Sequence, residues 1–260
     1  GRYPLLRTDD LVGGIFLPKD GQADPANVAM AYAKGARNGG ARIFEQVERM
    51  RILVAQGRAA GVLTREGPIR ATPTVLAAGM WGRAIAREVG VAVPLPAAEH
   101  FSIVTEPVAG LPRDLPVLRV PDECAYIKED AGKLLLGAFE PVAKPWGMAG
   151  IPDDFEFTTL PDDVEHFEPI LEAAVRRLPV LAKTGIQTFF NGPESFTPDD
   201  RYLLGETAEL RDLFVACGMN SIGIGSSGGV GKMLAEWIRD RHMPADLVDV
   251  DVRRLAWNGC

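Results

Sequence analysis

Apolar residues recur every three to four positions in four stretches of the chain, which is the spacing of an amphipathic helix. The first stretch follows Asp24 and Pro25, a pair that suits the start of a helix, and it stops at Gly39. The second ends at Gly90, and the third covers 161–178. The fourth begins near the end of the glycine-rich run 218–231 and ends at Pro244. The positions expected to face inward are Ala29, Tyr32, Ala33 and Ala36; Trp81, Ile85 and Val89; Val164, Phe167, Ile170, Leu171, Ala174, Val175 and Leu178; and Val230, Met233, Leu234, Trp237 and Ile238.

Shorter apolar runs bounded by glycine or proline predict strands. Three of them, with Gly57 before the third and Gly67 after it, predict an antiparallel meander. The predicted strands are 41–44; 47–51, 52–55 and 60–65; 74–77; 102–105, 125–128 and 133–139; 186–190; and 213–217. Helices that alternate with strands indicate an α/β fold, and the strand-rich part between 96 and 190 predicts an inserted second domain with an antiparallel sheet.

The composition excludes some classes of function. Lys and Arg total 28 against 35 Asp and Glu, a net charge of -7, so nothing favours nucleic-acid binding. No apolar run reaches the length of about 18 residues that a membrane span needs, so we expect no membrane partner. The three histidines are scattered, which predicts no metal site. Cys124, Cys217 and Cys260 are also far apart, which favours a reducing compartment: the cytoplasm, or the mitochondrial matrix in a eukaryote.

Six glycines fall within residues 218–231. Gly223 to Gly228 spell G-x-G-x-x-G, the pattern that places a pyrophosphate at a helix N-terminus, and Asp249 and Asp251 follow about 20 residues later, near the spacing of a ribose-binding acid. However, only about 30 residues follow the glycines, too few for the rest of a nucleotide-binding sheet. This interpretation is therefore disfavoured.

The same run also contains G-x-S-x-G, with Ser227 in the place of a hydrolase nucleophile. That elbow needs a strand leading directly into the serine, but the predicted strand ends ten residues earlier, and His242 is the only later histidine. Two interpretations remain open. The glycines let the following helix pack closely against the sheet, or the loop amides and the helix N-terminus face the polar edge of a cofactor.

Five short stretches, in the same order along the chain, resemble one known family. They are 21–25 (GQADP), 77–81 (AAGMW), 96–100 (PAAEH), 191–199 (NGPESFTPD) and 218–224 (GMNSIGI). They resemble the dimethylglycine and sarcosine dehydrogenase branch of the D-amino-acid-oxidase-like FAD-dependent oxidoreductases. The resemblance implies a partial, Rossmann-like FAD-binding domain formed by 1–95 and 191–260, and a substrate-binding domain at 96–190.

The resemblance also implies which residues contact the cofactor, FAD. Val47 matches the family residue whose backbone contacts adenine, although a plain strand residue is the alternative. Trp81 lies in a turn expected to pass close to the dinucleotide, and it could equally be a core residue. The full expected set is Val47, Ala78, Gly79, Trp81, Met219, Asn220, Ser221, Ile222, Gly223 and Ile224, of which the last six match the loop against the flavin ring.

For catalysis, His100 and Tyr126 match the active-site histidine and tyrosine of the family, and His100 is expected beside the reactive face of the flavin. Taken alone, such a histidine or tyrosine is more often structural. The implied reaction removes a hydride from a small N-methylated amino acid of the sarcosine or dimethylglycine class. It gives an iminium ion that yields formaldehyde and the demethylated amine. A non-catalytic regulatory relative with the same fold is the alternative.

Three parts of the family pattern are missing from this sequence. The opening strand with its own G-x-G-x-x-G and ribose-binding acid is expected before residue 1, as is the histidine that carries covalent flavin in many members. The folate-binding region of longer members is expected after Cys260. We therefore expect the chain to be part of a longer protein, to bind flavin poorly by itself, and to meet an electron-transfer acceptor or folate-binding domain in the complete protein.

Overall fold

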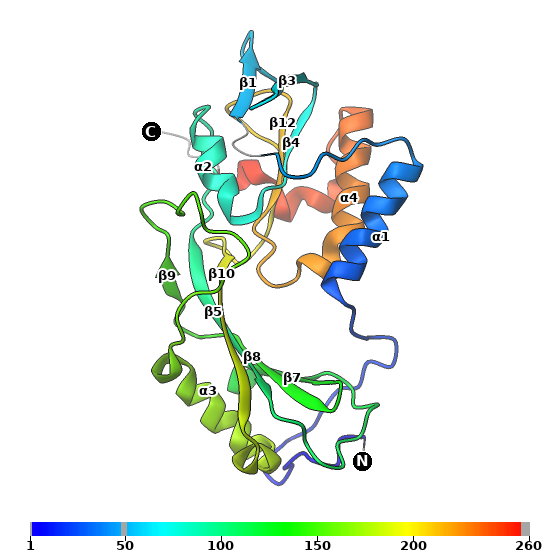
Figure 1. The fold of residues 1–260 in the computed structure, drawn as a ribbon. Coiled ribbons are helices and arrows are strands. Elements are labelled where there is room, and N and C mark those ends of the chain that lie inside the picture. Colours follow the sequence, from blue (N-terminus) through cyan, green and yellow to red (C-terminus); the bar gives the residue numbers. More distant parts are fainter. Residues whose placement is uncertain (1, 48–50, 256–260) are drawn as a thin grey trace. The chain divides into compact units, whose positions relative to one another are not determined.

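The computed structural model describes residues 2–47 and 51–255 (Figure 1). The chain divides into two compact units. Unit 1 comprises Gly1–Asp24, Glu99–Lys144 and Asp154–Pro193, and unit 2 comprises Pro25–Ala98, Pro145–Asp153 and Glu194–Cys260. Residues 1–24, which the sequence analysis grouped with the flavin-binding part, thus cluster with unit 1.

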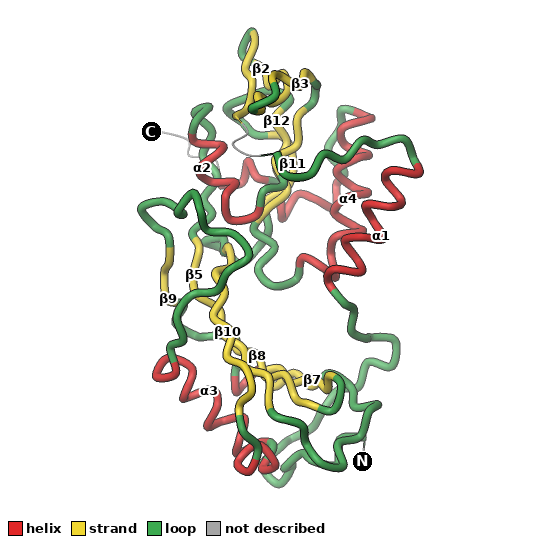
Figure 2. Tube along the Cα trace, viewed as in Figure 1, coloured by secondary structure: helices red, strands yellow, loops and turns green. Residues whose placement is uncertain are grey.

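Helices and strands alternate along the chain, in agreement with the predicted α/β class (Figure 2). The α-helices are α1 (Pro25–Asn38), α2 (Gly82–Arg87), α3 (Val164–Arg177) and α4 (Gly223–Asp240). The strands are β1 (Arg51–Ala55), β2 (Arg58–Thr64), β3 (Gly67–Arg70), β4 (Thr74–Leu76), β5 (Ala97–Thr105), β6 (Leu118–Val120), β7 (Ala125–Asp130), β8 (Lys133–Ala138), β9 (Lys144–Trp146), β10 (Ile186–Ser195), β11 (Leu203–Glu206) and β12 (Leu213–Cys217).

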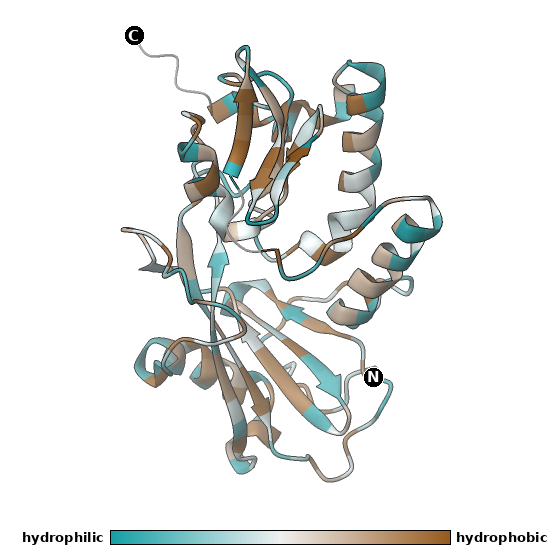
Figure 3. Cartoon of the chain, turned by 45° about the horizontal axis from the view of Figure 1, so that its top comes forward, coloured by the Kyte–Doolittle hydropathy of each residue, from teal (hydrophilic) through white to brown (hydrophobic). Residues whose placement is uncertain are grey.

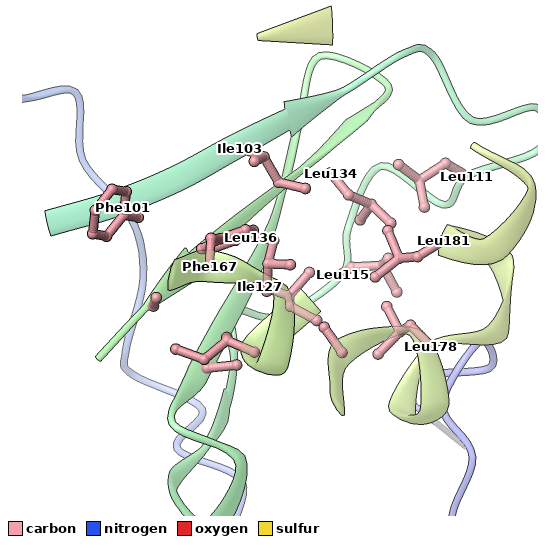
Figure 4. Close-up of a cluster of buried hydrophobic side chains, with 14 residues drawn as sticks. Phe101, Ile103, Leu111, Leu115, Ile127, Leu134, Leu136, Phe167, Leu178 and Leu181 are labelled. Atoms are coloured by element: carbon pink, nitrogen blue, oxygen red, sulfur yellow. The ribbon is translucent and has the colours of Figure 1, made fainter. Parts of the chain in front are cut away.

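Unit 1 is built on an antiparallel sheet with one buried face. Its strands are hydrogen-bonded in the order β10-β5-β8-β7-β6. Successive residues of a strand point to opposite faces, so Phe101 and Ile103 of β5 pack with Ile127 of β7 against α3 (Figure 4). The amphipathic α3 begins after Asp163, whose side chain accepts a hydrogen bond from the His166 backbone N–H. The other face of the sheet remains for polar and aromatic side chains.

Unit 2 contains the antiparallel meander β1-β2-β3 and the sheet β11-β12-β4, in which β12 and β4 run parallel. Both faces of β12 are buried. Leu213, Val215 and Cys217 face a core shared with α2, while Phe214 packs edge-on against Trp237 of α4 at a ring-centroid distance of 5.7 Å. The sequence of β12, LFVAC, is apolar at every position, as a strand buried on both sides requires. Figure 3 shows hydrophobic residues along many of the strands.

Most predicted elements are present, and several details were wrong. Residues 41–44 form a loop instead of a strand, with Phe44 61% exposed. The predicted strand 47–51 overlaps β1 only at Arg51, and 48–50 lie outside the described residues. The inward positions Val164 and Trp81 are exposed, and β3, β6, β9 and β11 were not predicted. Short strands and isolated apolar runs depend on their partners, which local patterns do not identify.

The predicted helix at 25–38 is present, but its apolar face is not buried. None of the described side chains of α1 is buried, and Tyr32 is 55% exposed. Tyr32 nevertheless approaches α4 closely, since a Cβ on Gly228 would lie 2.8 Å from its hydroxyl oxygen. Gly228 therefore allows a close contact of α4 with α1, which is a different neighbour from the sheet that the sequence predicted.

Candidate functional site

Unit 2 contains a pocket of about 400 Å³ at the carboxyl ends of two parallel strands. Ala77 and Gly79 follow β4, and residues 216–219 end β12, so both segments reach the same edge of the sheet. In open α/β sheets this edge is where ligands bind. The remaining lining comes from the end of β10 and the start of α4: Glu194, Ser195, Ser221, Gly223 and Ile224.

The loop between β12 and α4 has an unusual backbone. Gly218 has a φ of 69°, and the non-glycine residues Asn220 and Ser221 also have positive φ values of 46° and 65°. Such conformations cost energy outside glycine and persist only when surrounding contacts impose them. The Asn220 amide nitrogen donates to Thr197 Oγ1 and Asp200 Oδ1, both at 3.1 Å. The side-chain oxygen of Asn220 is buried without a partner.

Glu194 holds the next residue of this loop. Its carboxylate accepts hydrogen bonds from the Ser221 backbone N–H at 2.5 Å and from the Ser221 hydroxyl at 2.6 Å. No side chain caps the N-terminus of α4, whose N-cap position is occupied by Ile222. The first backbone N–H groups of a helix have no partner within the helix and carry a partial positive charge. Gly223 and Ile224 bring this helix end to the pocket.

The lining is compatible with a flavin ring. Apart from Glu194, whose carboxylate is bound by Ser221, the lining residues are small or apolar. The N-terminus of α4 can stabilise the negative charge that a reduced flavin carries on its pyrimidine edge. Cys217 also lines the pocket, and burial raises the pKa of its thiol to about 12, so it stays uncharged. Among the described residues, no group of three His, Cys, Asp or Glu side chains is arranged to hold a metal ion.

The structure gathers part of the predicted cofactor-binding set. Gly79, Met219, Ser221, Gly223 and Ile224 line the pocket, and Ala78, Asn220 and Ile222 are their chain neighbours. Trp81 lies in the 3₁₀ turn after β4 and is 40% exposed, whereas Val47 is half-buried in a loop and is not part of the lining. Sequence reasoning missed Glu194, although it lies inside the stretch 191–199 that carries the resemblance.

The alternative interpretations of the glycine run disagree with the structure. Residues 223–231 are helical, so neither glycine motif forms a loop. The Ser227 hydroxyl donates to the Ile224 carbonyl within α4, so Ser227 is not an exposed nucleophile at the end of a strand. The carboxylate of Asp251 is occupied by Arg253, and Asp249 pairs with Arg201. The ribose-binding role for these acids therefore loses its support.

A second constellation lies on the polar face of the unit 1 sheet. The pairing register places Arg119, Tyr126, Gly137 and Ser102 in one row across β6, β7, β8 and β5. The Tyr126 ring lies directly on Gly137, because a Cβ there would come within 2.0 Å of the Tyr126 Cζ atom. A residue without a side chain is therefore needed beneath the tyrosine ring.

Phe139 joins the two predicted catalytic residues. Its ring centroid lies 5.9 Å from that of His100 and 5.4 Å from that of Tyr126. The guanidinium carbon of Arg119 stacks over the same ring at 3.7 Å, a favourable cation–π geometry. The structure thus brings His100 and Tyr126, which are 26 positions apart (126 − 100), onto one aromatic residue with a cation beside them.

Glu140 contacts His100 from the end of β8, and sequence reasoning missed it. Its carboxylate lies 3.2 Å from His100 Nδ1 and accepts a hydrogen bond of 3.0 Å from the Phe101 backbone N–H. Burial by itself would raise the pKa of Glu140, but the hydrogen bonds from His100 and from the backbone lower it below its ordinary value. Glu140 is therefore ionised at neutral pH. The predicted placement of His100 beside the flavin stays a prediction, since His100 belongs to unit 1 and the pocket to unit 2.

Comparisons with known proteins agree with the resemblance. The family model described as FAD dependent oxidoreductase (DAO) matches residues 1–237. Among curated relatives, 4-methylaminobutanoate oxidase (formaldehyde-forming) of Paenarthrobacter nicotinovorans is 41% identical over 98% of this chain and 31% of its own length. Human mitochondrial sarcosine dehydrogenase is 39% identical over 97% of this chain and 28% of its own length. The regulatory subunit of mouse mitochondrial pyruvate dehydrogenase phosphatase is 35% identical over 97% and 29%.

The chain thus spans about a third or less of the length of these curated relatives. Among solved structures, L-proline dehydrogenase from P. horikoshii superposes with a TM-score of 0.76 at 23% identity, covering 91% of this chain and 61% of that one. This match supports the same fold. None of the helices within the described residues has the length and apolar character needed to cross a membrane.

Proposed function

The chain belongs to the DAO family of FAD-dependent oxidoreductases, and on this premise we propose that the protein oxidises the C–N bond of a small N-methylated amino acid. The observation that carries the proposal is the sharing of Phe139 by His100 and Tyr126 on one face of the unit 1 sheet. This face offers a base, a phenol and, through Arg119, a cation. These are the groups that an amino acid with an N-methyl substituent requires.

When bound, FAD would supply the two-electron acceptor for a hydride from the N-methyl group of the substrate. The residues of this chain prepare the amine. An ammonium group has no free lone pair to drive hydride loss, so His100 removes its proton first. Tyr126 orients the substrate or passes the proton on, and Arg119 pairs with the carboxylate. The iminium product then hydrolyses to formaldehyde and the demethylated amine, in line with the formaldehyde-forming relative.

The flavin ring is assigned to the unit 2 pocket. In this proposal the uncapped N-terminus of α4 stabilises the pyrimidine edge, and Gly79 with Met219 to Ile224 contact the ring. Val47, Ala78 and Trp81 complete the predicted FAD contacts, within a flavin-binding domain of 1–95 and 191–260 and a substrate domain of 96–190. An electron acceptor and a folate-binding domain elsewhere in the whole protein belong to the same proposal.

We also propose a reducing compartment, the cytoplasm or the mitochondrial matrix. Cys124 and Cys217 are free thiols, and the human and mouse relatives are named as mitochondrial.

The test is anaerobic mixing of the flavin-loaded protein that contains this chain with sarcosine, dimethylglycine and 4-methylaminobutanoate. We expect at least one amine to bleach the flavin absorbance. His100→Asn should slow bleaching about 100-fold or more at unchanged flavin content, within the 10²- to 10⁴-fold usual for a general base. Absence of bleaching with every amine, over the pH range 6–9, would contradict the proposal.

The second candidate is a non-catalytic regulatory protein, which the 35% identity to the phosphatase regulatory subunit favours. A protein of this kind would bind flavin without bleaching and would co-purify with a phosphatase. The presence of both His100 and Tyr126 supports the enzyme instead, so bleaching separates the two candidates directly.

A further inference from the structure

We propose that Glu140 is a positioning residue that sets the tautomer and orientation of His100, an inference that rests on the proposed function. The two residues lie 40 positions apart in the sequence, one on β5 and the other just after β8. Neither composition nor spacing pairs them. Their contact arises because β5 and β8 are antiparallel neighbours, paired at Ser102 and Gly137.

The carboxylate of Glu140 is held at two points. One oxygen accepts from the Phe101 backbone N–H at 3.0 Å and the other lies 3.2 Å from His100 Nδ1. Both partners are consecutive residues of β5, so movement of the carboxylate along the strand would break one contact or the other. The Glu140 side chain is 6% exposed and that of His100 is 19% exposed. The pair is therefore largely shielded from water, and its interaction is stronger than that of a surface pair.

The hydrogen-bond pattern determines the position of the proton on the ring. An ionised carboxylate only accepts hydrogen bonds, and a neutral imidazole donates from one nitrogen and accepts at the other. Since the pKa of Glu140 is lowered, its carboxylate is ionised and Nδ1 of His100 must carry the proton. The lone pair then resides on Nε2. Without Glu140, the protonated nitrogen of His100 would be the one that donates to water or to another acceptor.

The His100 imidazole also contacts an aromatic ring. Phe139, which directly precedes Glu140, meets the imidazole at 57° with centroids 5.9 Å apart. The same face of the sheet carries the ionisable groups Tyr126, Lys128 and Asp130 on β7 and Arg119 on β6. Tyr126 and Arg119 contact the Phe139 ring, and Lys128 pairs with Asp130 at 3.7 Å. Glu140 thus places a carboxylate in direct contact with His100.

This arrangement suits proton removal from an ammonium substrate. The substrate N–H bond breaks, a new N–H bond forms at Nε2, and the positive charge moves from the amine to the imidazole. The carboxylate at Nδ1 stabilises that charge and holds the ring during the transfer. No oxidant or further reactant takes part in this step.

The experiment compares Glu140→Gln with wild type in the protein that contains this chain. Glutamine keeps the size of the side chain and removes its charge. We expect bleaching by the amine to slow about 10- to 100-fold, the scale known for groups that orient metal-binding histidines. The pH at which the rate reaches half its maximum should fall, because the uncharged amide stabilises the imidazolium less. Glu140→Asp, which retains the charge, should restore part of the rate.

A second readout does not require turnover. In ¹⁵N-histidine-labelled protein, the His100 signals are identified by their loss in His100→Asn, and wild type should show a protonated Nδ1. Glu140→Gln should populate the other tautomer. The matched control is Glu129→Gln, a buried glutamate of the same sheet that accepts from the Gly132 backbone N–H, and it should leave the His100 signals and the rate profile unchanged.

The outcomes separate the two proposals. If wild type bleaches and Glu140→Gln has the same rate, pH profile and His100 signals, the positioning role is wrong and the proposed function stands. If no amine bleaches wild type, the proposed function fails, and the ¹⁵N signals alone decide whether Glu140 sets the tautomer. If Glu140→Gln does not fold, Glu140→Asp decides. A rate and pH profile between those of wild type and His100→Asn supports the positioning role. A rate and pH profile indistinguishable from wild type contradicts it.

Discussion

Two glycine positions show how single residues control the candidate site. Gly137 has ordinary backbone angles, so its role is steric: the Tyr126 ring occupies the space where a side chain would lie. Gly218 differs, since its φ of 69° suits glycine and a Cβ there would lie 2.6 Å from Thr197 Cγ2. The first glycine positions a proposed substrate-binding side chain, and the second allows β12 to turn into the pocket loop.

Gly137→Ala should displace the Tyr126 ring, because the new methyl group would overlap its Cζ atom. Overpacking of this kind costs about 1–3 kcal/mol. We expect a lower melting temperature and a raised KM for the amine, measured by thermal unfolding and by bleaching at varied substrate concentration. Gly192→Ala is the control, since nothing lies within 4 Å of a Cβ at that position. Equal effects from both variants would show that Tyr126 does not depend on Gly137.

Glu194→Ala should weaken flavin binding. It removes the acceptor for both the Ser221 backbone N–H and the Ser221 hydroxyl, and with it the contact that maintains the positive φ of Ser221. Hydrogen bonds to a charged group contribute about 1.5–3 kcal/mol each, so we expect the flavin Kd to rise about tenfold or more. Flavin fluorescence on release measures it.

The control for Glu194→Ala is Glu236→Gln, at a partly exposed position on α4 paired with Lys232 at 4.0 Å. It should leave the Kd unchanged. Glu194→Gln can still accept from the N–H and donate to the hydroxyl, and should lie between Glu194→Ala and wild type. An unchanged Kd in Glu194→Ala would remove the loop from the proposed flavin site.

At the scale of elements, one buried carboxylate connects three parts of unit 2. Asp212 precedes β12, is 1% exposed, and pairs with Arg58 at the start of β2 and with Arg241 at the end of α4, the latter at 2.7 Å. Burial would raise the pKa of Asp212, but the two guanidinium groups lower it below its ordinary value. The meander and α4 are therefore both attached to the central sheet through this side chain.

Asp212→Asn should lower the free energy of unfolding at neutral pH by about 2 kcal/mol. Removing one partner of a fully buried ion pair costs about 3–5 kcal/mol, and we expect less here because both arginines are half-exposed. A carboxyl group with a lowered folded pKa stabilises the fold above its ordinary pKa and loses this contribution as the pH falls through the folded value. The difference between wild type and variant should therefore shrink below about pH 4.

Urea unfolding between pH 3 and pH 8 measures this difference. Asparagine also tolerates the positive φ of 60° at this position, so backbone strain does not confuse the result. A difference that stays constant with pH would assign the effect to packing instead of charge.

At the scale of the whole molecule, two units with separate cores carry the two parts of the proposed site. Unit 2 carries the pocket at the ends of parallel strands, and unit 1 carries the face with His100, Tyr126 and Glu140. The family match runs through both, over residues 1–237. The chain enters and leaves each unit more than once, so neither function can be assigned to one continuous half of the sequence.

The sequence by itself determined the α/β class, the four α-helices, the presence of an antiparallel meander and the family, although the third strand of the meander lies at 67–70, where no strand was predicted. These follow from local periodicity and short motifs, which a single stretch of chain contains. It predicted a strand for the loop 41–44, because an apolar run forms a strand only where a partner strand is available. It also placed the start of α4 too late, because glycine is a weak helix former whose low helix propensity packing can override. It also selected His100 and Tyr126, though only through resemblance.

Tertiary structure alone decided which side chains meet. Glu140 lies beside His100, Glu194 beside Ser221, and Asp212 between Arg58 and Arg241, across separations of 27 to 154 residues (212 − 58 for the longest). These contacts depend on strand order and register, and a shift of one residue in register would turn each side chain to the other face of its sheet. Register results from packing over the whole unit, so no local pattern in the sequence contains it.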